Sequence, residues 1–225
     1  MHPLKYILNV MHKYLNPNPS KGIMCFPVKR GGLRTEDALG FLETVSIEVR
    51  KKTRLRNEHC QSYKCKEYII TSGKGWYQSE GLLESKTLGT IPAYFKIRVS
   101  VKHNNVSINF KLTCMEDIDD VEMVKSWCWL NADTYSILEN SYSLLPASSL
   151  WEKMYEGNVD RVKFTNKNGE LSLVSRESNF FKYDRIWKHE AHAEYVTMWI
   201  HEPKGIILKK GTIYECIWNL KYEGN

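Results

Sequence analysis

The chain has 225 residues and a formal net charge of +6, is 42% hydrophobic and 26% charged, and contains 7 Trp, 13 Tyr and 7 Phe. This length fits one domain with a sizeable core, and the density of aromatic residues excludes disorder over most of the chain. Its six cysteines are scattered and follow no recognisable export signal, so we expect reduced thiols in a cytoplasmic or nuclear protein that is not secreted.

The first 34 residues are expected to form a partly irregular arm. Apolar residues at Leu4, Ile7 and Leu8 would give an amphipathic helical turn or two, and the sequence Asn-Pro-Asn-Pro at residues 16–19 ends any such helix. Residues 35–225 are then expected to form a single domain.

That domain is predicted to begin with a helix. Thr35 is a suitable N-cap with acidic residues after it, and the helix would bury Phe41 and Leu42. From Val45 onward apolar and polar residues alternate, which is typical of a strand.

The middle of the chain is predicted to be rich in hairpins. Residues 94–101 and 106–114 alternate strictly between apolar and polar positions and would pair as an antiparallel hairpin with a basic outer face. A glycine-rich turn at residues 72–75 predicts another hairpin ahead of it, and Asn168-Gly169 predicts a third between residues 161–165 and 170–174.

Two more helices are expected, one with apolar residues Val121, Val124 and Trp127 after an acidic start, and one over residues 146–155. Strands are predicted at residues 193–201, 206–208 and 212–222. The predicted fold class is therefore α+β, a single antiparallel sheet built from hairpins with two or three packing helices.

The densest basic run is the main electrostatic feature. Such a cluster attracts phosphate, whether of nucleic acid or of anionic lipid headgroups, although charge runs are equally often solvated faces without a partner. The candidate phosphate-, lipid- or nucleic-acid-binding residues are Lys29, Arg30, Arg34, Arg50, Lys51, Lys52, Arg54, Arg56, Lys96 and Arg98.

Candidate catalytic and metal-binding groups are few. His189, His192 and Glu194 form the best cluster, but the two histidines are three residues apart rather than the four that a zincin helix needs, and an exposed strand explains them. Cys60 and Cys65 lack a second ligand pair at a zinc-site spacing. We therefore expect a binding protein without catalytic residues, metal or cofactor.

Tryptophans are scattered through amphipathic segments. They could stack on nucleic-acid bases, but packing in the core is the better interpretation because aromatic side chains dominate protein cores. The six in question are Trp127, Trp129, Trp151, Trp187, Trp199 and Trp218.

One short segment resembles a known family. Lys210-Gly211-Thr212-Ile213, leading into an alternating strand through Trp218, is similar to a segment of rhabdovirus matrix proteins. The resemblance implies a non-enzymatic viral structural protein that binds anionic membrane or nucleocapsid peripherally and associates with itself.

Two alternatives remain open at this point. The same basic residues would serve a nucleic-acid-binding viral accessory protein, such as a movement protein or silencing suppressor. The other alternative is a metal-dependent hydrolase centred on His189, His192 and Glu194.

Overall fold

The computed structural model describes residues 24–28, 32–36, 41–54, 56–138, 140–144, 150–177, 183–189 and 192–224. These residues form seventeen strands and one short 3-10 turn, η1 (Ser62–Lys64), with no α-helix among them. Within the same ranges no helix is long and apolar enough to cross a membrane. The expected α+β class is therefore wrong, because the described chain is nearly all strand.

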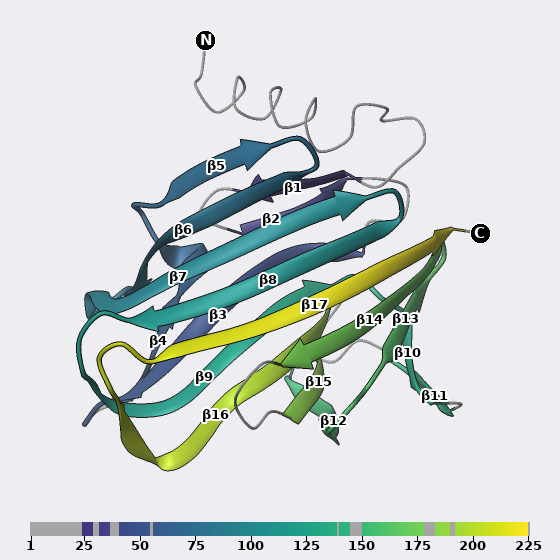
Figure 1. Cartoon of the computed structure of the whole chain (residues 1–225). Coiled ribbons are helices and arrows are strands. Elements are labelled where there is room, and N and C mark those ends of the chain that lie inside the picture. Colours follow the sequence, from purple (N-terminus) through teal and green to yellow (C-terminus); the bar gives the residue numbers. More distant parts are fainter. Residues whose placement is uncertain are drawn as a thin grey trace.

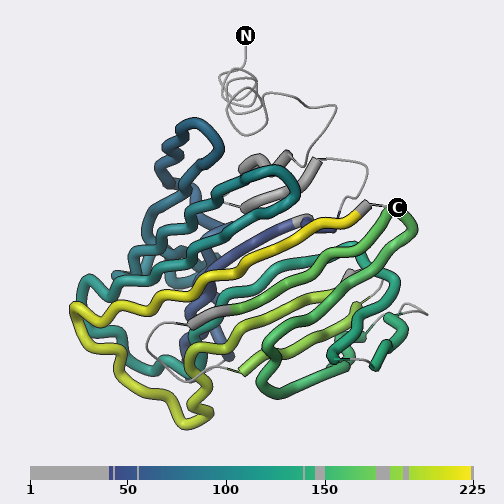
Figure 2. Tube along the Cα trace, turned by 45° about the vertical axis from the view of Figure 1, so that its right-hand side comes forward, coloured from purple at the N-terminus to yellow at the C-terminus, as the bar shows by residue number. Residues whose placement is uncertain are grey.

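Fifteen strands belong to one antiparallel sheet that folds over into two facing layers (Figure 1). The first layer contains, in spatial order, β11 (Asn140–Ser143), β10 (Thr134–Ile137), β13 (Val162–Asn166), β14 (Gly169–Glu177), β17 (Ile213–Gly224), β8 (Asn105–Cys114), β7 (Gly89–Lys102), β6 (Trp76–Ser85) and β5 (Ile69–Gly73). Figure 2 shows β17, in yellow, running beside the green strand β14.

The second layer continues from β6 through a single pairing between Gln61 and Glu84. It contains β4 (Asn57–Gln61), β3 (Leu42–Lys52), β9 (Ile118–Leu130), β16 (His192–Leu208), β15 (Tyr183–His189) and β12 (Glu152–Gly157). The remaining strands, β1 (Met24–Val28) and β2 (Gly32–Glu36), pair only with each other.

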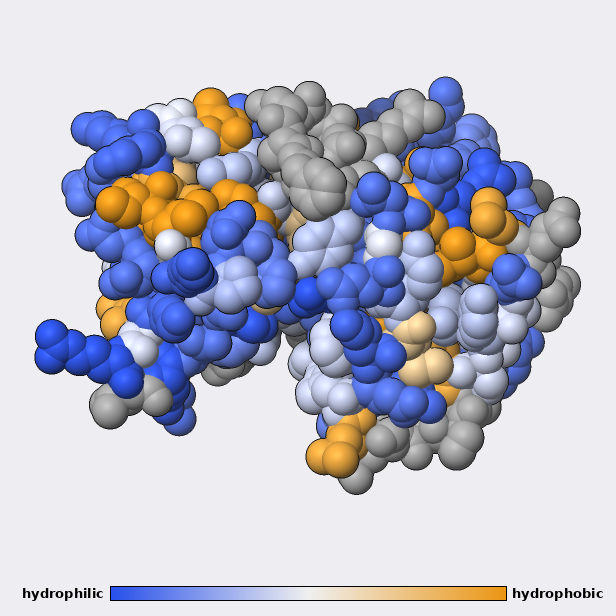
Figure 3. All heavy atoms as spheres, turned by 90° about the horizontal axis from the view of Figure 1, so that it is seen from below, coloured by the Kyte–Doolittle hydropathy of each residue, from blue (hydrophilic) through white to orange (hydrophobic). Residues whose placement is uncertain are grey.

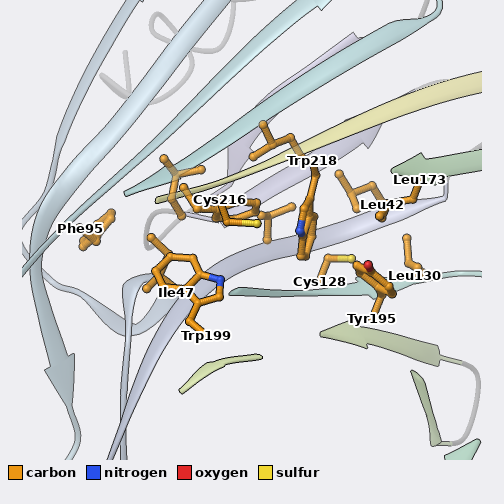
Figure 4. Packing of buried hydrophobic residues seen from close by; sticks show 14 of the residues in the cluster. Leu42, Ile47, Phe95, Cys128, Leu130, Leu173, Tyr195, Trp199, Cys216 and Trp218 are labelled. Carbon is orange, nitrogen blue, oxygen red and sulfur yellow. The ribbon is translucent and has the colours of Figure 1, made fainter. Parts of the chain in front are cut away.

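The core lies between the two layers, where one face of each meets the other (Figure 4). Trp218 of β17 is fully buried and contacts Phe110 of the same layer and Tyr195 of the opposite layer, with ring centroids 4.6 and 5.2 Å apart. Large aromatic rings that bridge the layers bury much apolar area, which is the main force holding such a sandwich together.

A buried carboxylate organises the polar part of this core. Asp184 of β15 is 0% exposed, and its Oδ1 accepts hydrogen bonds from Tyr195 Oη (2.8 Å) and Thr197 Oγ1 (2.9 Å). Its Oδ2 accepts one from the backbone N–H of Val159 (3.3 Å), and Trp218 Nε1 donates to Thr197 Oγ1 (3.1 Å). These contacts link the two layers in one fixed register, because the Tyr195 hydroxyl and the Trp218 indole N–H would otherwise be buried without these partners.

The predicted hairpins are confirmed. The strands expected at residues 94–101 and 106–114 are β7 and β8, with Val101 opposite Val106. The strand pairs β5–β6 and β13–β14 are joined by the two other predicted turns. The strands expected near the C-terminus lie within β16 and β17. Gly75 of the first turn has φ +74°, which a side chain rarely adopts, so glycine is needed there.

All three predicted helices are wrong. Thr35 lies in β2 and Leu42 in β3, while residues 37–40 between them lie outside the described residues. The segment with Val121, Val124 and Trp127 is β9, and β12 covers the second half of the helix expected at 146–155. Residues 146–149 lie outside the described part.

The physical reason is clearest for β9. Val124 and Cys128 face the core, whereas Met123 and Trp127 are buried on the opposite face of the same strand. A strand covered on both faces carries apolar residues at nearly every position, so it lacks the two-residue alternation that marks a half-exposed strand. The division into an arm at residues 1–34 and a domain at 35–225 stays a prediction, since residues 1–23 lie outside the described ranges.

The Asp184 network predicts a large effect on stability. Replacing Asp184 with Ala leaves the Tyr195 hydroxyl and the backbone N–H of Val159 buried without their acceptor and removes one acceptor of Thr197, so the free energy of unfolding should fall by about 3–5 kcal/mol. Urea denaturation measures this loss. The exposed Asp160→Ala is the control and should change stability by less than about 0.5 kcal/mol; equal effects of the two substitutions would contradict the role of the network.

Candidate functional site

A pocket of about 470 Å³ lies on the outer face of the second layer. It follows from strand alternation: Val45, Ile47 and Val49 of β3 point into the core, so Glu48 and Arg50 point the other way. Its volume is within the range of pockets that bind small molecules. Seen from below, the surface is hollowed between two lobes, and both lobes carry hydrophobic patches among hydrophilic residues (Figure 3).

Aromatic side chains form much of the wall. Tyr63 of η1 packs edge-on against Trp127 with ring centroids 5.4 Å apart, and Trp127 lies 5.5 Å from Trp129. Trp151, which is 45% exposed, stacks on His189 at 4.7 Å. Such rings offer flat apolar surface to a ligand with little loss of conformational entropy on binding.

One carboxylate lies between two of these rings. Glu194 of β16 is paired across the sheet with Trp129 of β9 on one side and with Trp187 of β15 on the other, and all three side chains line the pocket. Neighbouring strands are about 4.8 Å apart, so two indoles on the strands either side of Glu194 flank its carboxylate. We call Trp129, Glu194 and Trp187 the indole slot.

Lys125 connects the slot with a second carboxylate. This lysine is only 9% exposed, and its Nζ lies 3.1 Å from Glu194 Oε1 and 3.6 Å from Glu48 Oε2. Because both carboxylates contact the same nitrogen atom, the pair and the lysine form one electrostatic unit on the pocket floor.

Glu48 is the more strongly ionised of the two carboxylates. It is 1% exposed, receives a hydrogen bond from Gln61 Nε2 (2.5 Å) and lies 2.7 Å from His59 Nδ1. Burial raises its pKa, but the Lys125 ammonium and the contacts with His59 and Gln61 outweigh burial and hold the pKa well below the usual range.

Glu194 is shifted in the opposite direction. Burial raises its pKa above the ordinary value of 4.5, the nearby charge of Lys125 opposes that shift, and the charge of Glu48 adds to it. Two neighbouring carboxyl groups whose pKa values are pushed apart can divide acid and base roles between them. Glu194 is therefore the group of this pair that can carry a proton into a reaction.

Three basic side chains, Arg50, Arg185 and His201, line the same pocket. Arg50 and His201 lie opposite Met123 on the strands to either side of it. The guanidinium of Arg185 lies 5.1 Å from the ring of Tyr183, whose Oη is 2.8 Å from His201 Nδ1. Burial and the charge of Arg185 lower the pKa of His201. Arg185 lies nearer to the indole slot than the other two, since it is two residues from Trp187 along β15.

The described members of the predicted basic set differ in their surroundings. Arg50 enters the pocket, Lys52 Nζ donates to the carbonyl of Pro203 (3.0 Å), and Arg56 pairs with Glu58 at 2.7 Å. Lys51 is half-buried and Arg54 is exposed.

The other predicted basic residues are farther away. Lys96 pairs with Glu80 (3.0 Å), and Arg98 lies over the ring of Trp76 (4.4 Å). Arg34 is in β2, while Lys29 and Arg30 lie outside the described residues. Binding of phosphate by these ten residues, and membrane or nucleic acid as a partner, stay predictions.

The predicted histidine cluster lies at the hairpin between β15 and β16. His189 ends β15 and His192 begins β16, opposite each other, and Glu190 lies outside the described residues. Glu194 contacts Lys125 rather than a histidine. Among the residues that the structure describes, no group of three or more His, Cys, Asp or Glu side chains is placed to hold a metal ion. His59 likewise faces Glu48, while Cys60 and Cys65 are buried free thiols.

The tryptophans divide into two groups. Trp199 and Trp218 pack in the core as predicted, whereas Trp127, Trp129, Trp151 and Trp187 line the pocket. The sequence contained one usable signal: Trp127 and Trp129 are two residues apart, with Lys125 before them, so a strand would place all three on one face.

Comparison with known proteins identifies the fold. No protein-family model matches the chain, and no curated protein matches it in sequence. A galactose mutarotase-like protein from Lactobacillus casei is similar in structure, with a TM-score of 0.61, 9% identity, and coverage of 91% of this chain and 98% of that chain. The Slr1438 protein from Synechocystis matches with a TM-score of 0.59 and 6% identity over 90% of this chain and 92% of that chain.

A galactose mutarotase-like protein from Clostridium acetobutylicum matches over 90% of this chain and 92% of its own, with a TM-score of 0.51 and 9% identity. At such low identity these matches show a shared fold. The chain therefore has the β-sandwich fold found in galactose mutarotase-like proteins.

The rhabdovirus matrix resemblance is wrong. Gly211 has φ +79° and lies in the turn between β16 and β17, so Lys210-Gly211 is a common turn signal rather than a family motif. The fold counterparts are mutarotase-like proteins, a finding against the matrix function and against its two alternatives, a viral accessory protein of the movement or silencing-suppressor type and a metal-dependent hydrolase. The expectation of a non-enzymatic protein conflicts with the names of these counterparts. The expected location stays a prediction.

The depressed pKa of Glu48 predicts a specific pH dependence of stability. A carboxyl group with a pKa below its unfolded value of 4.5 stabilises the fold above that pH, and this stabilisation is lost as the pH falls toward the folded pKa. Glu48→Gln should flatten the decline in unfolding free energy below about pH 4.5. Urea denaturation at intervals of about half a pH unit between about pH 3 and 6 measures the unfolding free energy at each pH. Glu67→Gln, at an exposed carboxyl, is the control; an unchanged slope in Glu48→Gln would refute the assignment.

Proposed function

We propose that the protein binds the reducing end of a saccharide in the indole slot and interconverts its anomers by proton transfer through Glu194. The observation that carries this proposal is the position of Glu194, whose side chain is 13% exposed and whose pKa is raised, between the rings of Trp129 and Trp187. The mutarotase-like names of the fold counterparts agree with this chemistry.

The composition of the pocket suits a sugar. A pyranose ring has an apolar face of C–H groups, which packs on an indole, and a rim of hydroxyl groups, which needs hydrogen-bond donors and acceptors. Trp129 and Trp187 offer the flat surfaces, while Lys125 and Glu194 offer a donor and an acceptor on the floor between them.

Proton transfer by Glu194 accounts for ring opening without another reactant. The protonated carboxyl donates its proton to the ring oxygen while its carbonyl oxygen accepts the proton of the anomeric hydroxyl. The bond between the anomeric carbon and the ring oxygen breaks, an aldehyde forms, and Glu194 is again protonated. Rotation about the adjacent carbon–carbon bond and reversal of these steps give the other anomer.

Removing the carboxyl group tests this mechanism. Glu194→Gln should slow anomer interconversion by about 100-fold or more while leaving saccharide affinity within a few-fold, since a general acid–base group contributes about that much to the rate. NMR exchange spectroscopy on a panel of reducing hexoses measures the rate at which the two anomers of each sugar interconvert. If the wild-type protein binds saccharides without interconverting their anomers, it is a saccharide-binding protein rather than an enzyme. An unchanged rate in Glu194→Gln would exclude Glu194 as the proton-transfer group.

The pH profile provides a second test. The reactive form of Glu194 is protonated, so the rate should fall as the pH rises through its pKa, which burial has raised above 4.5. Lys125→Met removes the nearby charge that opposes this shift, so the decline should move to higher pH. A decline at the same pH in both proteins would contradict the assignment.

Stacking on the slot can be tested apart from catalysis. Trp187→Ala should weaken saccharide binding by about 3- to 10-fold, the usual contribution of one aromatic contact, measured by isothermal titration calorimetry. Trp76→Ala, on the first layer beneath Arg98, is the matched control and should leave affinity unchanged. Equal losses in the two variants would argue against a ligand in the indole slot.

A further inference from the structure

A second hollow, of about 560 Å³, lies on the outer face of the first layer, across the adjacent strands β7, β8, β17, β14 and β13 (Figure 1). Four basic side chains line it: Lys102, Arg161, Lys163 and Lys221. We call this hollow the lysine groove. It is separate from the pocket that holds the indole slot, since none of its lining residues lines that pocket.

The three lysines of the groove stand in one row across the sheet. Lys102 is paired with Asn105, which is paired on its other side with Lys221. Lys221 is paired in turn with Ser172, and Ser172 with Lys163. Directly paired residues point to the same face, and the residues before and after Lys163, Ser172 and Lys221 are in the core, so the row points outward. Lysines on every second strand are roughly 10 Å apart, with a short polar side chain between them.

The positive charge of the groove is only partly balanced. Two of the four cations pair with the two carboxylates among the described lining residues, Lys163 with Glu170 at 2.9 Å and Lys221 with Glu223 at 2.5 Å. Lys102 and Arg161 are exposed, and neither forms an ion pair within the described part of the chain. These two charges are therefore available to an anionic ligand that enters the groove.

The side chains between the cations suit a ligand rich in hydroxyl groups. Serine and asparagine side chains both donate and accept hydrogen bonds, as sugar hydroxyls do. Five of them line the groove: Ser100, Asn105, Ser107, Ser172 and Asn219.

Other anionic polymers fit the groove less well. None of its described lining residues is aromatic, whereas proteins that hold single-stranded nucleic acid stack the bases on aromatic rings. An extended acidic peptide commonly pairs its backbone with a free strand edge, and the groove lies on the face of a sheet.

We propose that the lysine groove binds an acidic polysaccharide chain, with acidic groups at Lys102 and Arg161 and hydroxyl groups at the serine and asparagine side chains. The acidic groups are carboxylates or sulfate esters, both of which accept charged hydrogen bonds from lysine and arginine. The inference does not rest on the proposed function, because the groove and the indole slot share no residue.

Calorimetric titration of the wild-type protein tests this with an oligogalacturonate long enough to cross five strands, roughly 20 Å. Its methyl ester has the same chain without the charges, and a sulfated dextran oligomer carries sulfate in place of carboxylate. One of the two acidic oligomers should bind about 10-fold or more tightly than the methyl ester, the contribution of a charged hydrogen bond. The tighter of the two identifies the acidic group.

Replacing the two unpaired cations should remove most of this advantage. Lys102→Gln/Arg161→Gln changes exposed side chains, so the fold should be unaffected, while affinity for the better acidic oligomer should fall about 10-fold. Lys86→Gln/Arg54→Gln removes one exposed lysine and one exposed arginine that do not line the groove, and it should keep wild-type affinity. The comparison of ligands in the wild-type protein stands even where a variant fails to fold.

Further outcomes would overturn the inference. Equal affinity for the acidic oligomers and the methyl ester would show that charge is not recognised. Tighter binding of single-stranded RNA or of a polyglutamate peptide than of either acidic oligomer would exclude a polysaccharide as the ligand. Loss of acidic-oligomer binding in Trp187→Ala, with Lys102→Gln/Arg161→Gln unaffected, would place the polymer in the indole slot instead. Failure of reducing hexoses to bind would overturn the proposed function and leave this inference standing.

Discussion

The two-residue alternation of side chains along β3, β9 and β16 is the constraint on which the rest of the structure depends. In these strands one set of residues, including Ile47, Cys128 and Tyr195, completes the core between the layers. The intervening residues necessarily project from the outer face. A shift of one residue in register would exchange the two sets, so the core that fixes the register also fixes the pocket.

The buried polar contacts reinforce that register from the core side. Asp184, Thr197 and Trp218 are joined by hydrogen bonds that tie β15 and β16 to β17 across the layers. On the pocket side of the same strands, Arg185 and Glu194 alternate with these core residues. The hydrogen bonds of Asp184 therefore also help to position the charged side chains on the pocket side of these strands, although they do not contact them.

Lys125 largely determines how the two carboxyl groups of the pocket ionise. By contacting both carboxylates it stabilises a buried negative charge on Glu48, while burial still favours the protonated form of Glu194. The difference between two otherwise similar carboxyl groups comes from their neighbours and their burial rather than from residue type. That asymmetry is what makes a proton-transfer role for Glu194 physically reasonable.

Local patterns were sufficient to predict half-exposed hairpins such as β7–β8, because their alternation and turn residues lie in one short segment. They misled at β9, where an acidic start and the three-residue spacing of Val121, Val124 and Trp127 suggested a helix. In the strand, Met123 and Val124 are instead buried on opposite faces. The pocket was not predictable in the same way. Glu48, Lys125 and Glu194 come from three strands far apart in the chain, and only the pairing of β3, β9 and β16 brings them together.

A crystal structure of the protein with a bound reducing saccharide tests the central claim most directly. We expect a sugar ring against Trp129 or Trp187, with its anomeric hydroxyl or ring oxygen within hydrogen-bonding distance of the Glu194 carboxyl group. A saccharide bound elsewhere, such as the outer face of the first layer near Lys102 and Arg161, with the indole slot empty, would contradict it.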